Sequence, residues 1–192
     1  KTLGYEKDIP AGRFKLVKAA TNFDIIDQLV NGIHVNKRVT ILEGWTITVI
    51  AKELEEKLGM DPQVFEDACQ NKLLLWKWGI EGESVEGYLF PDTYRFSEDE
   101  TPQEIIGRMI EEYKKNVTDD LRQEMVDKSI TETEVLILAS IIEGEAIYDQ
   151  ERSIISGVYH NRLRMGMRLQ ADPTIQYIVE GAPRRLLNKD LK

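Results

Sequence analysis

Residues 131–145 read TETEVLILASIIEGE, and this stretch decides the fold of the second half of the chain. Thr131 and Glu134 have the spacing of a capping box, in which each side chain accepts a hydrogen bond from the other residue's backbone where a helix begins. The apolar residues from Val135 to Ile142 lie nearly all round such a helix, so we predict a central, buried helix.

Two acids, Glu143 and Glu145, follow at the C-terminal end of this helix. At about 100° per residue, Glu145 lies above the bulky apolar stripe Leu138–Ile142, whereas Glu143 lies above a thinner face. Both carboxylates lie at the negative end of the helix dipole, which disfavours their ionised form, as a general acid working near neutral pH requires. The alternative is that Glu145 pairs with Arg152 or Arg162 and is structural only.

A second polar segment, MRLQADPT at residues 167–174, comes after the next predicted helix. Its Gln170, Asp172 and Thr174 carry an amide, a carboxylate and a hydroxyl group, which can hold the hydroxyl and acetamido groups of a sugar. The alternative is an ordinary polar loop in which Asp172 caps a helix that begins at Pro173.

Composition excludes several function classes. The chain has 192 residues and a formal net charge of −9, which argues against a protein that coats nucleic acid, because phosphate binding needs clustered Lys and Arg. The single cysteine, Cys69, excludes a disulfide framework and a cysteine-based zinc site. His34 and His160 lie far apart in the sequence, and no Gly-rich phosphate loop follows a predicted strand. We therefore predict no metal and no cofactor.

The length of the predicted elements changes near residues 77–83. Before this point the elements are short, and a strand over 39–41 with a helix over 46–58 forms a small αβ unit. After it come longer helices. We therefore predict an α+β fold in two lobes, residues 1–78 and 79–192. The later helices are predicted over 101–115, 121–128, 131–146 and 149–165.

Four stretches resemble the endolytic murein transglycosylases of the YceG-like (MltG) family. They are EGYLFPDTY at 86–94, LASIIEGE at 138–145, Glu151-Arg152, and VYHNRLRMGMRLQADPT at 158–174. The last run is highly specific, and the resemblance covers nearly the whole chain.

The resemblance implies a fold and an activity. Family members carry a small LysM-like αβ module, expected here in residues 1–78, and a mainly helical, lysozyme-like transglycosylase lobe, expected in 79–192. They are lyases that cut the β-1,4 bond between N-acetylmuramic acid (MurNAc) and N-acetylglucosamine (GlcNAc) in nascent peptidoglycan. The cut leaves 1,6-anhydro-MurNAc ends.

The resemblance also implies a location and partners. We expect a bacterial protein held in the cytoplasmic (inner) membrane by one N-terminal helix that this chain lacks. Its catalytic part would lie on the outer, periplasmic or extracellular, face. The expected partners are glycan strands, peptidoglycan synthases and the cell elongation machinery, with no nucleic acid and no cofactor. The chain begins at Lys1 and ends in a charged segment, so we expect a piece of a longer protein with its catalytic lobe incomplete at the C-terminus.

Among the residues, the resemblance implies that Glu145 is the single general acid and base. Related transglycosylases have a small hydroxyl residue after this glutamate, whereas this chain has Ala146. The residues expected to bind or orient the substrate are Glu143, Gln170, Asp172, Thr174, Asn161 and Arg162.

Two alternatives stay open at this point. The chain could be a non-catalytic scaffold that binds peptidoglycan through its LysM-like part. It could instead be a hydrolytic muramidase, which needs a second carboxylate to activate water, and Glu143, Asp149 and Asp172 are the candidates.

Overall fold

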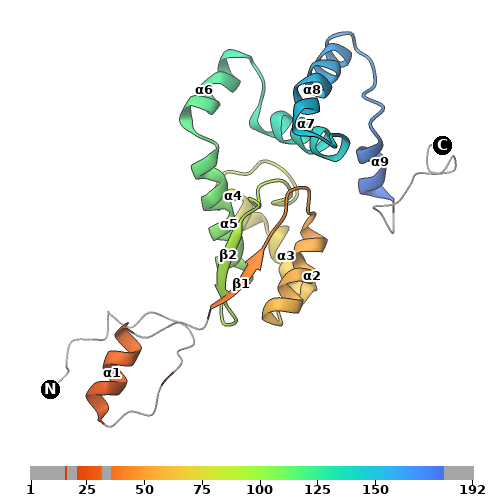
Figure 1. The fold of residues 1–192 in the computed structure, drawn as a ribbon. Coiled ribbons are helices and arrows are strands. Elements are labelled where there is room, and N and C mark those ends of the chain that lie inside the picture. The colour runs from red at the N-terminus through yellow and green to blue at the C-terminus, as the bar shows by residue number, and fades with distance from the viewer. Residues whose placement is uncertain (1–15, 17–20, 32–35, 180–192) are drawn as a thin grey trace. The chain divides into compact units, whose positions relative to one another are not determined.

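The computed structural model describes residues 16, 21–31 and 36–179. The chain forms two compact units, Lys1–Asn116 and Val117–Lys192. Both are rich in helices, and the described strands form one two-stranded sheet (Figure 1). The fold is therefore α+β, as the sequence predicts. In the described ranges, no helix is long and apolar enough to cross a membrane.

The first unit contains most of the elements. In chain order they are α1 (Asn22–Asn31), β1 (Asn36–Thr40), α2 (Ile47–Leu58), α3 (Pro62–Cys69), α4 (Lys72–Trp78), β2 (Thr93–Ser97) and α5 (Pro102–Asn116). The predicted helices over 46–58 and 101–115 correspond to α2 and α5. Helix α2 begins after Thr46, whose side chain accepts a hydrogen bond from the Val49 N–H, and ends at Gly59, which adopts a φ of 75°.

The boundary between the units lies between Asn116 and Val117, not near residues 77–83 as the sequence suggested. The reason is a long-range strand pairing. Strand β2 is antiparallel to β1, with Val39 opposite Tyr94 and Thr40 opposite Thr93. Helices α2 and α3 pack on each other, and α3 also packs on α5. The core accordingly takes fully buried side chains from both sides of the expected junction: Val39, Leu54, Phe65, Phe96 and Ile106.

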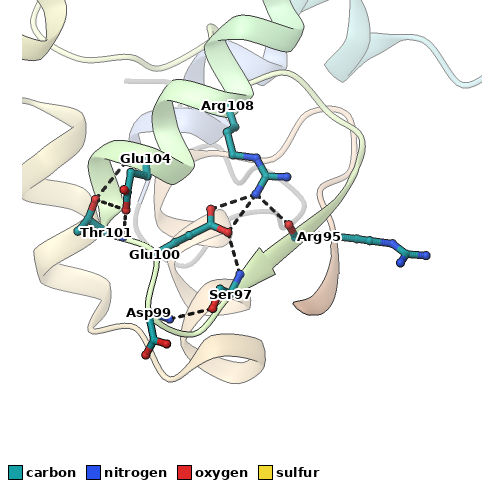
Figure 2. Close-up of polar contacts among 7 residues, drawn as sticks. All are labelled: Arg95, Ser97, Asp99, Glu100, Thr101, Glu104 and Arg108. Atoms are coloured by element: carbon teal, nitrogen blue, oxygen red, sulfur yellow. Dashed lines mark hydrogen bonds and ion pairs between the residues drawn. The ribbon is translucent and has the colours of Figure 1, made fainter. Parts of the chain in front are cut away.

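A polar network fixes the corner between β2 and α5 (Figure 2). Arg108 Nη1 donates to the Arg95 carbonyl oxygen at 2.8 Å and to the two Glu100 carboxylate oxygens at 3.0 and 3.1 Å. The Ser97 N–H donates to the same carboxylate at 2.8 Å. The Arg108 guanidinium also lies 4.8 Å from the centre of the Phe96 ring. One arginine thus ties the helix to the strand that closes the first core.

The stretch EGYLFPDTY at 86–94 has a structural role in this unit. The carboxylate of Glu86 accepts the Ile47 N–H, with its two oxygens 3.2 and 3.3 Å from the nitrogen, and so binds the first turn of α2. At the other end, the Tyr94 hydroxyl donates to the Phe90 carbonyl oxygen at 2.6 Å. The stretch therefore connects the start of α2 to the start of β2.

The second unit consists of α6 (Asp119–Asp127), α7 (Glu132–Glu145), α8 (Asp149–Arg164) and α9 (Asp172–Ile178). The first three match the helices predicted over 121–128, 131–146 and 149–165. The capping box of Thr131 and Glu134 is present at the start of α7. A small core joins α7, α8 and the start of α9, and it is formed by Leu138, Ile141, Tyr159 and Ala171.

The prediction that α7 is buried nearly all round is wrong for the residues described. Only Leu138 and Ile141 of this helix are buried, and Ile137 is 57% exposed. Helices α8 and α9 contact α7, and the buried residues mark the one face that they cover. An apolar sequence shows that a helix has apolar faces, but burial also needs neighbours for each face.

Glu86 gives the first unit a testable pH dependence. Burial raises the pKa of this carboxyl above its ordinary value of 4.5, and the Ile47 N–H opposes the shift. Because the folded state binds this proton more tightly, the Glu86 contribution to stability is present below pH 4.5 and is lost as pH rises through the raised pKa. Glu86→Gln keeps an oxygen acceptor for Ile47 and carries no charge. We expect the unfolding free energy of Glu86→Gln to rise relative to that of the parent protein as pH rises through the raised pKa of Glu86.

Urea unfolding at a series of pH values measures this difference. Glu81→Gln removes a carboxyl group at an exposed position in the same segment and is the control for the loss of one charge. A difference between Glu86→Gln and the parent protein that stays constant with pH would contradict the prediction.

Candidate functional site

A pocket of about 280 Å³ lies on the second unit. Its polar lining is Glu145 from the end of α7, Tyr159 and Arg162 from α8, and Gln170 from the segment before α9. Apolar side chains of α8, together with Leu169, form the rest of the wall. A few convergent polar groups against an apolar wall are typical of a binding or catalytic site.

Glu145 is half-buried and is held by a neutral donor. The Asp172 N–H donates to Glu145 Oε1 at 3.2 Å. In the part of the chain that the structure describes, no Lys or Arg forms an ion pair with Glu145. Arg152, one of the two partners suggested by the sequence, instead pairs with Glu143 and Asp149, each at 2.9 Å. Among the described residues, Glu145 therefore does not form the ion pair with Arg152 or Arg162 that a purely structural role would need.

The other suggested partner, Arg162, binds the segment before α9. Its Nη1 donates to the Arg168 carbonyl oxygen at 3.2 Å, to the Leu169 carbonyl oxygen, and to Gln170 Oε1 at 3.3 Å. Gln170 has a φ of 55°, in the left-handed region that residues other than glycine rarely adopt. Arg162 thus holds a strained segment at the edge of the pocket.

The predicted site residues separate into two groups. Glu145, Arg162 and Gln170 line the pocket, and Asp172 joins them through its backbone. Three others do not line it: Glu143 pairs with Arg152, Asn161 accepts from Arg164 at 2.9 Å, and the Thr174 hydroxyl donates to the Ala171 carbonyl oxygen at 2.6 Å. Their expected role in binding or orienting the substrate stays a prediction.

Sequence reasoning missed Tyr159. Its side chain is 6% exposed and lines the pocket beside Glu145. Burial raises the pKa of the Tyr159 hydroxyl, the Glu145 charge acts in the same direction, and Arg162 opposes both. The signal in the sequence was its spacing: Tyr159 stands three residues before Arg162 and four after Ile155, so all three share one face of α8.

A glycine permits the contact between α7 and α9. A Cβ atom added at Gly144 would lie 2.7 Å from both Cβ and Cγ of Pro173, closer than such atoms approach. Glycine at this position therefore lets the start of α9 lie against the end of α7. This close approach brings the Asp172 N–H to Glu145.

The described residues contain no candidate metal site. Over residues 16, 21–31 and 36–179, no group of three or more His, Cys, Asp or Glu side chains could hold a metal ion. Cys69 lies in the first core, and burial raises the pKa of its thiol, so it is not a reactive thiolate. The pocket itself presents a carboxyl group beside hydrogen-bond donors.

Comparison with known proteins decides the family. The model of the YceG-like family matches residues 1–192. The chain belongs to the YceG-like family.

Two relatives and one crystal structure carry this comparison further. The endolytic murein transglycosylase of Bacillus subtilis is 36% identical over 108 residues, which are 56% of this chain and 30% of that protein. The protein of the same name from Streptococcus pneumoniae is 29% identical over 196 residues, or 88% of this chain and 35% of that one. A crystal structure of a yceG-like protein from Listeria monocytogenes matches with a TM-score of 0.75 and 26% identity, covering 96% of this chain and 66% of that one. The chain spans about a third of the length of the curated relatives it matches.

In this YceG-like chain, two of the stretches that carried the resemblance converge on the pocket. The stretch 138–145 supplies Glu145, and the run 158–174 supplies Tyr159, Arg162 and Gln170. The stretch 86–94 belongs to the first unit and has the structural role described above.

Gly144→Ala tests the close approach of α7 and α9. The added methyl group must push Pro173 away, and overpacking of this kind typically costs about 1–3 kcal/mol. We expect a lower free energy of unfolding for the second unit in urea titrations. Gly157→Ala in α8 is the matched control, because a Cβ atom there meets nothing within 4 Å. Alanine in a helix interior should stabilise by about 0.5–1 kcal/mol relative to glycine. Equal stability of the two variants would show that the contact is unimportant.

Proposed function

We propose that this chain carries the catalytic part of an endolytic lytic transglycosylase. It cleaves the β-1,4 bond between MurNAc and GlcNAc in nascent peptidoglycan strands and leaves 1,6-anhydro-MurNAc ends. The observation that carries the proposal is the place of Glu145, in a pocket beside Gln170 and held by a backbone N–H rather than by a cation. The names of the curated relatives, endolytic murein transglycosylases, support the same reaction.

One carboxyl group is sufficient for this reaction. Glu145 donates its proton to the glycosidic oxygen, the bond from C1 to that oxygen breaks, and the GlcNAc end leaves with a hydroxyl group. The C6 hydroxyl of the same MurNAc then bonds to C1, and its proton passes to Glu145, which returns to its starting form. The second step is intramolecular, so proximity replaces an activated water.

The positions of the other carboxylates favour this reaction over hydrolysis. A hydrolytic muramidase needs a second carboxylate beside the scissile bond. Two of the three candidates, Glu143 and Asp149, share Arg152 and do not line the pocket. The third, Asp172, touches Glu145 through its backbone N–H.

The two parts of the chain have different roles in this proposal. We assign the αβ elements β1, α2 and α3 to a LysM-like module that binds glycan, and the second unit to the lysozyme-like lobe that cuts it. The protein would act on the outer face of the cytoplasmic membrane, held there by a single N-terminal helix. Its partners would be peptidoglycan synthases and the elongation machinery. A non-catalytic scaffold is the rival proposal, and it gives no role to Glu145.

Glu145→Gln should abolish cleavage and leave the fold intact. Glutamine keeps the shape and an acceptor for the Asp172 N–H but cannot pass a proton. General acid–base catalysis contributes about 10²–10⁴-fold, so we expect a loss of at least this size. Glu143→Gln is the matched control: it loses only the exposed pair with Arg152 and should stay active. The experiment measures cleavage of glycan strands and the melting temperature of each variant in the full-length protein.

Mass spectrometry of the products separates the proposals. Anhydro ends from the parent protein support a transglycosylase, reducing ends indicate a muramidase, and no products indicate a scaffold. An active Glu145→Gln variant, or one that is inactive because it is unfolded, would overturn the role of Glu145.

A further inference from the structure

Among the described residues, Arg162 of α8 forms no ion pair. Its contacts are with acceptors of the segment before α9: the carbonyl oxygens of Arg168 and Leu169 and the amide oxygen of Gln170. Arg162 itself lines the pocket and is half-buried. A charged side chain used in this way holds a segment in place rather than balancing a charge.

The chemistry of the guanidinium group fixes the direction of the Gln170 amide. A guanidinium has N–H donors and no acceptor, so only the amide oxygen of Gln170 can face it. The 3.3 Å contact between Arg162 Nη1 and Gln170 Oε1 therefore turns the NH2 group of Gln170 away from Arg162. Gln170 is exposed, and over the described residues its Nε2 donates to no other residue. Its two N–H donors are available to a ligand.

The backbone of Gln170 depends on the same arginine. Its φ of 55° is disfavoured for a residue with a side chain, and such conformations persist where the surroundings hold them. The carbonyl oxygens that Arg162 binds belong to the two residues just before Gln170. Without these bonds the segment can return to a relaxed conformation, and the amide would lose its direction.

We propose that Arg162 is a positioning residue that fixes the Gln170 amide so that Gln170 Nε2 donates to the acetamido carbonyl oxygen of the bound glycan. The identity of this ligand rests on the proposed function. An amide N–H pairs well with an amide carbonyl oxygen, and an N-acetylated sugar presents one beside the ring. Arg162 thereby makes the site selective for N-acetylated glycan, although it does not itself contact the ligand.

A double-mutant cycle of binding tests this proposal. In the full-length protein, calorimetry gives the Kd for a soluble N-acetylated glycan fragment and for the same fragment after de-N-acetylation. Arg162→Lys keeps a positive charge, but its side chain ends one atom short of Nη1, the atom that makes all three contacts, and Gln170→Ala removes the amide. Each variant should bind the N-acetylated fragment about tenfold more weakly, the effect of one hydrogen bond, and should lose the preference for it.

The cycle also shows whether Arg162 acts through Gln170. In a Gln170→Ala background, Arg162→Lys should have no further effect on Kd, because coupled residues are not additive. Arg164→Lys, two residues along α8 and bonded to Asn161, is the matched control and should bind like the parent protein.

Additive effects of Arg162→Lys and Gln170→Ala would overturn the proposal. So would an Arg162→Lys variant that keeps its preference for the N-acetylated fragment, or a parent protein that has no such preference. Cleavage by the parent protein is measured separately. A preference without cleavage would sustain this inference and overturn the proposed function.

Discussion

The contact of Pro173 with Gly144 is the constraint on which the candidate site depends. The first residues of α9 can approach the end of α7 this closely only because residue 144 has no side chain. The same contact places the Asp172 N–H on the Glu145 carboxylate. On the other side, Arg162 of α8 binds residues 168–170. The chain between α8 and α9 is therefore held to α7 at one end and to α8 at the other. The pocket lies where these two sets of contacts come together.

This arrangement fits the acid and base role that we propose for Glu145. The Asp172 N–H, a neutral donor, is bonded to Glu145 Oε1, and the Tyr159 side chain lines the pocket beside this carboxylate. Its neighbour on the helix, Glu143, shows the contrast, because it is paired with Arg152 outside the pocket. Two acids that are two residues apart thus have different surroundings, since the helix turns them to different faces.

Local patterns in the sequence predicted a large part of this structure. Capping residues and apolar periodicity located α2, α5, α6, α7 and α8, and helical geometry placed Glu145 and Glu143 on different faces. Strand β2 was missed because its partner β1 lies more than fifty residues away, and for the same reason the junction near residues 77–83 was misplaced. Tyr159 and the partners of Arg162 were missed because they follow from how α7, α8 and α9 pack, which no local pattern encodes. The exposure of Ile137 is a further case, because periodicity does not reveal which faces of a helix find a neighbour.

The most direct test of the account is a crystal structure of the full-length Glu145→Gln protein with a bound glycan fragment. The account predicts that the fragment lies in the pocket, with a glycosidic oxygen within hydrogen-bond distance of residue 145 and an acetamido carbonyl oxygen on Gln170 Nε2. A fragment bound elsewhere on the protein, or bound in the pocket with residue 145 turned away from every glycosidic oxygen, would contradict it.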